Sequence, residues 1–292
     1  MALTASRTRV EVRPITEADL PRVAAFLQAH MNARVPAERW VSAFDAPWAG
    51  DRPNAGFMLL DDDAVVGAHL AFYSQRTIDG RTERFCDLAA WCVLEEYRFY
   101  GLRLLKALLA QDGYHFTDLS PSGNVVSINE RLGFRYLDTT TALVPSLPWS
   151  SWPGRATISA DPAVIERTLT GRDLQLYRDH AGAQAARHLV LVQGDEWCYV
   201  VIRRERWKRL PGFASILHVS NPELFRRLAR PFARHLLLRH RVVAALSEDR
   251  IAGRPPRLSF RVRPLRQRMF HSPDLEPEHI DYFYSELLCL SW

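Results

Sequence analysis

The fold is decided by the stretch VLEEYRFYGLRLL, residues 93–105. The apolar run over residues 85–94 predicts a strand, and the leucines that begin at Leu104 have the spacing of a helix. The strand and helix are joined by a short loop with one glycine. The first-turn amides of a helix lack intrahelical partners and, together with the macrodipole, favour an anion. Arg98 and Arg103 add positive charge, so we expect a phosphate-binding site here.

This loop resembles the pyrophosphate loop of the GCN5-related N-acetyltransferases, which is written Arg/Gln-x-x-Gly-x-Gly/Ala and holds acyl-coenzyme A. Arg98 and Gly101 match the motif, whereas Arg103 stands where the family has Gly or Ala. The second signature of the family is an Asn that opens a helix ending in Leu-Gly-Phe. Asn124 and the Leu-Gly-Phe of residues 132–134 match it. The resemblance implies these cofactor-binding residues: Val93, Leu94, Arg98, Phe99, Tyr100, Gly101, Leu102, Arg103 and Asn124.

The resemblance also indicates where catalytic groups are expected. Members of the family often use a tyrosine, four residues before the Gly of Leu-Gly-Phe, to protonate the leaving thiolate. Asn129 occupies that position here, so Asn129 and the nearby Ser127 are the candidates for this role. Asp87, on the strand before the loop, is our candidate for the general base. The alternative is that Asp87 pairs with Arg84 or ends a strand. A backbone N–H at Val93 or Leu94 is expected to polarise the acyl carbonyl.

The order of predicted elements repeats along the chain. The first repeat, residues 8–142, is expected to be the acetyltransferase-like domain with the acyl-coenzyme A loop. Residues 143–155 are rich in Pro and Ser and predict a linker. Residues 156–292 again predict hairpin, strand, helix and strand, closing with an apolar strand over residues 280–290. We therefore expect an α/β (α+β) fold: a tandem acyl-coenzyme A N-acyltransferase with mixed, mainly antiparallel sheets flanked by helices and a degenerate second copy.

The second copy is not expected to bind coenzyme A in the usual way. Its strand-to-helix junction, residues 218–223, contains no glycine, and no Leu-Gly-Phe follows.

Composition and charge exclude several classes of protein. The 292 residues are 47% hydrophobic and 24% charged, which is typical of a globular chain. No apolar run is long enough to span a bilayer, and the first residues lack a secretory core, so a cytoplasmic location is expected. The four cysteines and ten histidines show no metal-site spacing, and no metal is predicted.

The two halves differ in charge. Residues 1–150 contain 15 Lys+Arg and 18 Asp+Glu, whereas residues 151–292 contain 23 and 15. Because the basic residues alternate with apolar ones, they are typical of solvated faces, and nucleic-acid binding is not expected.

These observations predict a bacterial enzyme that transfers an acyl group, acetyl in the first instance, from acyl-coenzyme A to a small amine. The acceptor classes considered are an amino sugar, an amino acid and a natural-product amine, and the protein is expected to be a monomer or homodimer. Two alternatives remain open. One is a tRNA-dependent aminoacyl transferase of the cell-wall type, and the other is a catalytically inactive binding protein with the same fold.

Overall fold

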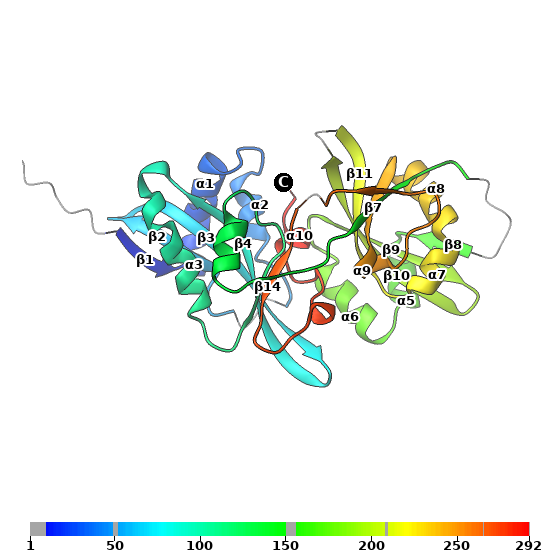
Figure 1. The fold of residues 1–292 in the computed structure, drawn as a ribbon, viewed down its shortest axis with the longest axis horizontal. Helices are drawn as coiled ribbons and strands as arrows, with labels where there is room; N and C mark the ends of the chain where they lie inside the picture. The colour runs from blue at the N-terminus through cyan, green and yellow to red at the C-terminus, as the bar shows by residue number, and fades with distance from the viewer. Residues whose placement is uncertain (1–9, 49–51, 150–155, 208–209, 265, 292) are drawn as a thin grey trace, which may run out of the picture. The chain divides into compact units, whose positions relative to one another are not determined.

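A computed structural model describes residues 10–48, 52–149, 156–207, 210–264 and 266–291, which form two compact units (Figure 1). Unit 1 contains residues 1–119, 270–274 and 284–292, and unit 2 contains residues 120–269 and 275–283. Each unit is therefore built from segments that are distant in sequence.

The first sheet has seven strands in the order β1-β2-β3-β4-β5-β14-β6. Its strands are β1 (Val10–Pro14), β2 (Gly56–Asp61), β3 (Ala64–Ile78), β4 (Arg81–Val93), β5 (His115–Asp118), β14 (Met269–His271) and β6 (Arg135–Tyr136). Strands β1 to β4 pair antiparallel, and β4 pairs with β5 in parallel. Tight turns at residues 62–63 and 79–80, which contain Asp and Gly, join β2 to β3 and β3 to β4.

Helices cover both faces of this sheet. They are the 3₁₀ helices Glu17–Asp19 and Glu95–Tyr100, α1 (Leu20–His30), α2 (Ala37–Ser42), α3 (Gly101–Leu109) and α10 (Glu286–Cys289). Side chains alternate along β2, so Met58 and Leu60 pack with α1 and α2, while Leu59 packs with Leu104 of α3. This alternation separates a face covered by α1, α2 and α10 from a face covered by α3.

The second sheet repeats this strand order. Its seven strands follow the order β13-β7-β12-β11-β10-β9-β8. They are β8 (Ala156–Ser159), β9 (Ala186–Gln193), β10 (Glu196–Trp207), β11 (Leu210–Val219), β12 (Ala244–Glu248), β7 (Thr141–Pro145) and β13 (Phe260–Val262). The helices of unit 2 are α4 (Val125–Arg131), α5 (Pro162–Thr168), α6 (Gly171–His180), α7 (Pro222–Arg227), α8 (Ala229–His240), α9 (Asp249–Ala252) and the 3₁₀ helix Pro277–His279.

Each sheet takes one strand from the other half of the chain. β14, from near the C-terminus, lies between β5 and β6 of the first sheet. β7, which precedes the expected second domain, lies between β12 and β13 of the second sheet. The expected linker at residues 143–155 thus overlaps the end of β7, and its residues 150–155 lie outside the described part of the chain.

Two local predictions for the second half are wrong. Residues 280–290 do not form a strand, because residues 286–289 are helical and belong to α10. Apolar runs of this length are ambiguous between strand and helix. The one helix expected between the last two strands of the repeat is instead two helices, α7 and α8, which are separated at Leu228.

Candidate active site

Strand β4 has a free edge beyond its pairing with β5. The parallel pairs run from Phe85↔His115 to Asp87↔Thr117, and β4 then continues to Val93 paired with β3 on its other edge. A bulge in the β3–β4 ladder at residues 89–90 adds to this divergence. The amide of Leu94 donates to the Val66 carbonyl on the β3 side at 3.0 Å. Since backbone direction alternates along a strand, the amide of Val93 points to the open edge, where an extended ligand can bond it.

The backbone becomes helical immediately after β4. A 3₁₀ helix, Glu95–Tyr100, leads directly into α3, and the Gly101 amide donates to the Arg98 carbonyl. Arg98 forms an exposed ion pair with Glu95 at 2.6 Å, and the Phe99 side chain is 97% exposed. Exposed ion pairs are weak, so the Arg98 guanidinium can exchange Glu95 for a phosphate at little cost.

Arg103 is directed away from that exposed pair. Its guanidinium donates to the Val10 carbonyl of β1 at 3.3 Å and lies 5.7 Å from the centre of the Tyr100 ring. The side chain that replaces the family's Gly or Ala is therefore accommodated against β1. Leu102, between Gly101 and Arg103, is 39% exposed.

Gly101 is buried, but the fold does not require a glycine at this position. Its φ of −53° is helical, and an added Cβ would meet Val93 at 3.5 Å and Trp91 at 3.8 Å, which are ordinary contacts. A glycine inside a helix costs up to about 1 kcal/mol relative to alanine. The Trp91 ring, next to Gly101, stacks on the His69 ring with 4.8 Å between the ring centroids. Burial lowers the pKa of His69 to about 3, so the imidazole is uncharged at neutral pH.

Asp87 lies at the last β4–β5 pair and is completely buried. Its Oδ1 accepts a hydrogen bond from Thr117 Oγ1 at 2.8 Å, and its Oδ2 accepts one from the Glu286 amide at 3.1 Å. Burial, and then the neighbouring Glu286 carboxyl, raise the pKa of Asp87 well above its usual value. Glu286 is a second buried carboxyl that the sequence analysis missed. The available signal was that it is the one charged residue in the apolar run of residues 282–290.

Comparison with protein-family models gives no match, and comparison with the sequences of curated proteins gives none either. Among solved structures, the chain is similar to a GCN5-related N-acetyltransferase from Anabaena variabilis ATCC 29413 (TM-score 0.59, 12% identity), covering 90% of this chain and 72% of that one. It is also similar to a GCN5-related N-acetyltransferase from Kribbella flavida (TM-score 0.53, 16% identity, 89% and 71% covered). A third similar structure is Saccharomyces cerevisiae N-myristoyltransferase with bound myristoyl-CoA (TM-score 0.50, 9% identity, 92% and 85% covered).

The fold is that of the GCN5-related N-acetyltransferases. Both the predicted fold class and the predicted resemblance are confirmed, and the two sheets of like strand order account for the repeat noted in the sequence.

The remaining candidates of the second signature lie at α4, which belongs to unit 2 of this acetyltransferase-like fold. Asn124 precedes the first turn of α4, and its carbonyl accepts a hydrogen bond from Ser127 Oγ at 2.9 Å. Ser127 thus makes the local bond usual for a serine near a helix end. Asn129 is fully buried, and its carbonyl accepts the amides of Leu132 and Phe134 where the helix ends.

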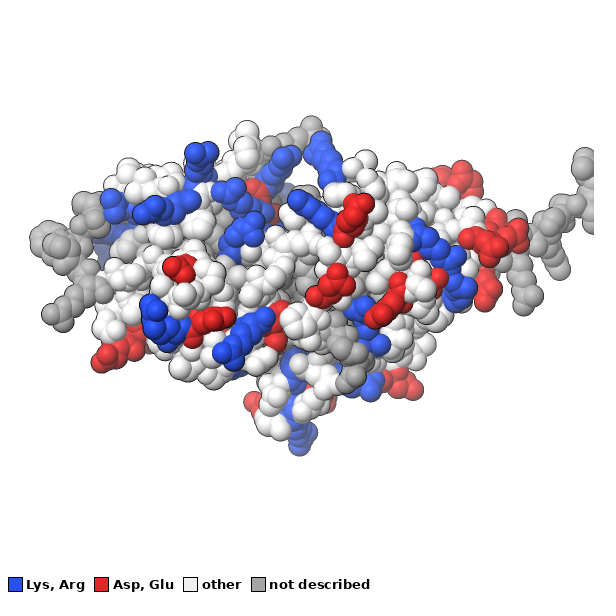
Figure 2. All heavy atoms as spheres, turned by 180° about the vertical axis from the view of Figure 1, so that it is seen from behind, with Lys and Arg blue, Asp and Glu red and all other residues white. Residues whose placement is uncertain are grey.

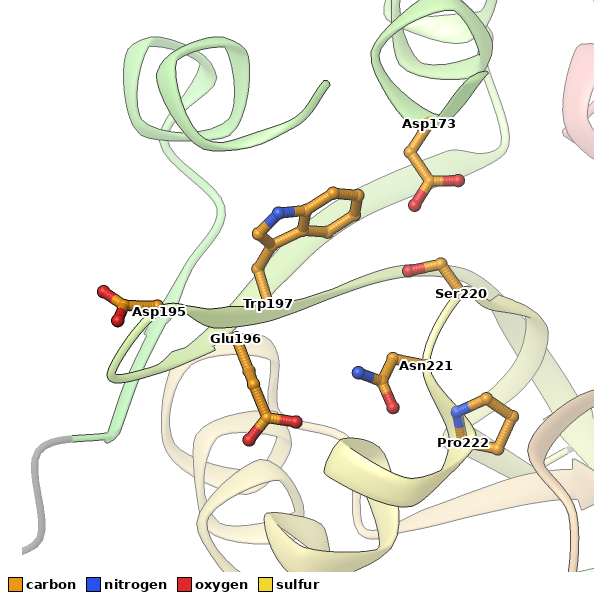
Figure 3. Close-up of a pocket in the computed structure, with 7 residues that line it drawn as sticks. All are labelled: Asp173, Asp195, Glu196, Trp197, Ser220, Asn221 and Pro222. Carbon is orange, nitrogen blue, oxygen red and sulfur yellow. The ribbon is translucent and has the colours of Figure 1, made fainter. Parts of the chain in front are cut away.

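In unit 2, the strand-to-helix junction equivalent to the end of β4 and residues 95–101 is acidic. A pocket of about 430 Å³ lies at the end of β11. Its lining residues are Asp173, Asp195, Glu196, Trp197, Ser220, Asn221 and Pro222 (Figure 3). Figure 3 shows the Asp173 carboxyl and the Trp197 ring on one side of β10 and the Glu196 and Asn221 side chains on the other. Carboxylates around this pocket repel the phosphates of coenzyme A.

The described residues contain no group of three His, Cys, Asp or Glu side chains arranged to bind a metal ion. Within the same residues, every helix is too short or too polar to serve as a membrane span.

Proposed function

We propose that this chain is an acyl-coenzyme A-dependent N-acyltransferase that acts on a small amine, with acetyl-coenzyme A as the first donor to test. One observation carries the proposal: β4 leaves β5 after Asp87 and runs unpaired on that side to a helix N-terminus bearing Arg98. Such an edge can hydrogen-bond the amide-bearing pantetheine arm, while Arg98 and the loop amides bind the pyrophosphate.

The chemistry follows from that placement. The Val93 amide bonds the pantetheine arm, and a backbone amide of the free edge nearer Asp87 donates to the thioester carbonyl and stabilises the negative charge that develops on its oxygen. The acceptor nitrogen attacks the carbonyl carbon, so that a C–N bond forms, the C–S bond breaks, and the coenzyme A thiolate leaves and is protonated. A proton acceptor is required near the inner end of the free edge, which is marked by Asp87 on the same strand.

The acceptor class is proposed by analogy. A fungal structure similar to this chain is described as a GCN5-related glucosamine N-acetyltransferase region (TM-score 0.55, 11% identity, covering 91% of this chain and 38% of that one). Glucosamine is therefore the first acceptor to test, followed by amino acids and small polyamines. Basic and acidic side chains both occur across the face shown in Figure 2, with neither sign covering it alone. A uniformly basic surface, which would favour a transfer-RNA donor, is not present on that face.

The proposal is tested by thermal unfolding of the full chain with acetyl-coenzyme A, longer acyl-coenzyme A species or transfer RNA, followed by a thiol-release assay with the amine panel. Acyl-coenzyme A at a hundredfold excess over its dissociation constant is expected to stabilise the chain by about 2.7 kcal/mol. Stabilisation by transfer RNA alone would instead favour the aminoacyl transferase. Binding without release of thiol for any amine would favour the inactive binding protein.

Gly101→Val gives a specific control. The Cβ of residue 101 faces the Val93 and Trp91 side chains, so the two methyl groups of valine would displace the end of β4 from the loop, and this variant is expected to lose the stabilisation by acetyl-coenzyme A. Gly182→Val is the matched variant, because no atom lies within 4 Å of a Cβ built there. Gly182→Val is expected to keep the full stabilisation.

A further inference from the structure

Two carboxyl groups from distant parts of the chain meet inside unit 1. Asp87 is on β4, Glu286 is the first residue of α10, and neither residue is exposed to solvent. Both Asp87 oxygens are occupied, one by the Thr117 hydroxyl and the other by the Glu286 amide. Asp87 is therefore held rigidly and has little capacity left for a substrate.

The carboxyl group of Glu286 is in the opposite situation. Both of its oxygens are buried, and no described residue donates a hydrogen bond to either. A buried polar group without a partner is costly, and two ionised carboxylates side by side are costlier still. Asp87 lowers that cost by keeping its proton, because burial and then the Glu286 carboxyl raise the pKa of Asp87 well above its usual value.

Other titratable side chains lie on the elements around the pair. The thiols of Cys289, on α10, and Cys86, on β4, are buried, and burial raises the pKa of each, so both remain neutral. On β3, the Arg76 guanidinium stacks on the Phe85 ring at 4.1 Å. On β5, His115 bonds Glu83 at 3.1 Å.

The pair also lies at the right distance from the loop. Asp87 ends the β4–β5 pairing, and six residue steps separate it from Val93. At about 3.3 Å per residue this is about 20 Å, close to the length of an extended pantetheine arm. A thioester whose pyrophosphate sits at the α3 end therefore places its reacting carbon beside the pair.

We propose that Glu286 is the general base that takes the proton from the acceptor's ammonium group, and that Asp87 is its positioning residue. This inference rests on the proposed N-acyltransferase function. The ammonium N–H bond breaks, its proton passes to the Glu286 carboxylate, and the freed electron pair of nitrogen attacks the thioester carbon. As the C–S bond breaks, the second proton leaving nitrogen neutralises the thiolate, and Glu286 then returns its proton to solvent.

Access to the pair requires side chains around α10 to move. Tyr284, two residues before Glu286, has a left-handed φ of 59°, which is a strained conformation for a residue with a side chain. Its ring makes an edge contact with the half-buried Trp48 at 5.1 Å.

The test compares Glu286→Gln, Asp87→Asn and the exposed control Glu38→Gln in the full chain. For each variant, the affinity for acetyl-coenzyme A is measured by calorimetry, and kcat and KM are measured against pH with the amine that the wild type uses. Glu286→Gln is expected to lower kcat at least about 100-fold and to leave the dissociation constant of acetyl-coenzyme A within about twofold. Its residual rate should rise steadily with pH as more free amine becomes available. Asp87→Asn should move the acidic limb of the pH profile to lower pH, because the neighbouring charge is gone, and Glu38→Gln should behave as wild type.

The outcomes separate the two proposals. A wild type that neither binds acetyl-coenzyme A nor acylates any amine overturns the proposed function. An active wild type together with a fully active Glu286→Gln variant overturns only the assignment of Glu286. If a variant does not fold, infrared spectroscopy of the wild type still decides whether the buried pair contains a protonated carboxyl group. A protonated-carboxyl band at neutral pH that sharpens or shifts on acetyl-coenzyme A binding supports the pair, and its absence overturns it.

Discussion

The backbone amide of Glu286 donates a 3.1 Å hydrogen bond to Oδ2 of Asp87, although 199 positions separate the two residues along the chain. The centre of unit 1 is thus completed by residues from near the C-terminus. The first sheet is also completed by a segment from near the C-terminus, because β14 lies beside β5. Stability of the first unit and placement of its candidate base therefore depend on the same returning segment.

Phe270 tests how strongly this segment stabilises the protein. It is fully buried on β14, and Phe270→Ala is expected to lower the free energy of unfolding by about 3–5 kcal/mol, since it leaves a cavity. Phe260 on β13 is 58% exposed, and Phe260→Ala is expected to change that free energy by no more than about 0.5 kcal/mol. Urea unfolding of the three proteins measures both values. Equal stability of the two variants would contradict the role given to β14.

Compared with the wild type, the Asp87→Asn variant is expected to become more stable as pH rises. Burial, and then Glu286, raise the folded-state pKa of Asp87 above its usual 3.8, so the native state keeps a proton that the unfolded chain has released. Stability conferred by the protonated form is complete below about pH 4 and declines as pH rises towards the folded-state pKa. The difference in unfolding free energy between variant and wild type should thus be more favourable at pH 8 than at pH 4. A difference in unfolding free energy that does not vary with pH would contradict a raised pKa of Asp87 in the folded protein.

Asp19→Asn should show the opposite pH dependence. Burial alone would raise the pKa of Asp19, but hydrogen bonds from Thr16 and Arg22 outweigh it and lower the pKa to about 2. The ionised form therefore stabilises the native state above about pH 4, and this contribution is lost as pH falls through 2. Asp19→Asn is expected to destabilise the protein at pH 7 and to approach the wild-type value in strong acid. Urea unfolding over the same pH range provides the comparison.

Arg98→Ala is expected to weaken acetyl-coenzyme A binding without destabilising the fold. Loss of a charge-assisted hydrogen bond to phosphate costs about 1.5–3 kcal/mol, or roughly ten- to a hundredfold in affinity. The exposed Arg98–Glu95 pair contributes little to stability, so thermal unfolding without ligand should be unchanged. Arg81→Ala, at the exposed opposite end of β4, is the matched control and should bind as wild type. Equal affinity in both variants would show that Arg98 does not contact the ligand.

The sequence predicts best where structure is local. The strand that ends at Val93, the turn at residues 62–63 and the helix that ends before Gly133 each follow from neighbouring residues, and each is present. The family resemblance rested on these same segments, which is why the fold class is confirmed despite identities as low as 9%.

What could not be predicted depends on pairing over long distances. β14 has only three residues and β7 only five, and neither carries a signal for which sheet it joins. The apolar run around Glu286 fits a strand as well as a helix, and the strand was the wrong choice. Because α10 was misassigned, the partner of Asp87 was missed. A lone charge in an apolar run is the pattern that would have indicated it.

Titration calorimetry of the full chain with acetyl-coenzyme A measures the central claim directly. The first sheet ends its free strand edge at a loop with Arg98, whereas the equivalent place in the second sheet is lined by Asp173, Asp195 and Glu196. We therefore predict one binding site per chain, abolished by Gly101→Val and retained in Gly182→Val. No binding heat under any condition, or two sites per chain, would contradict this assignment.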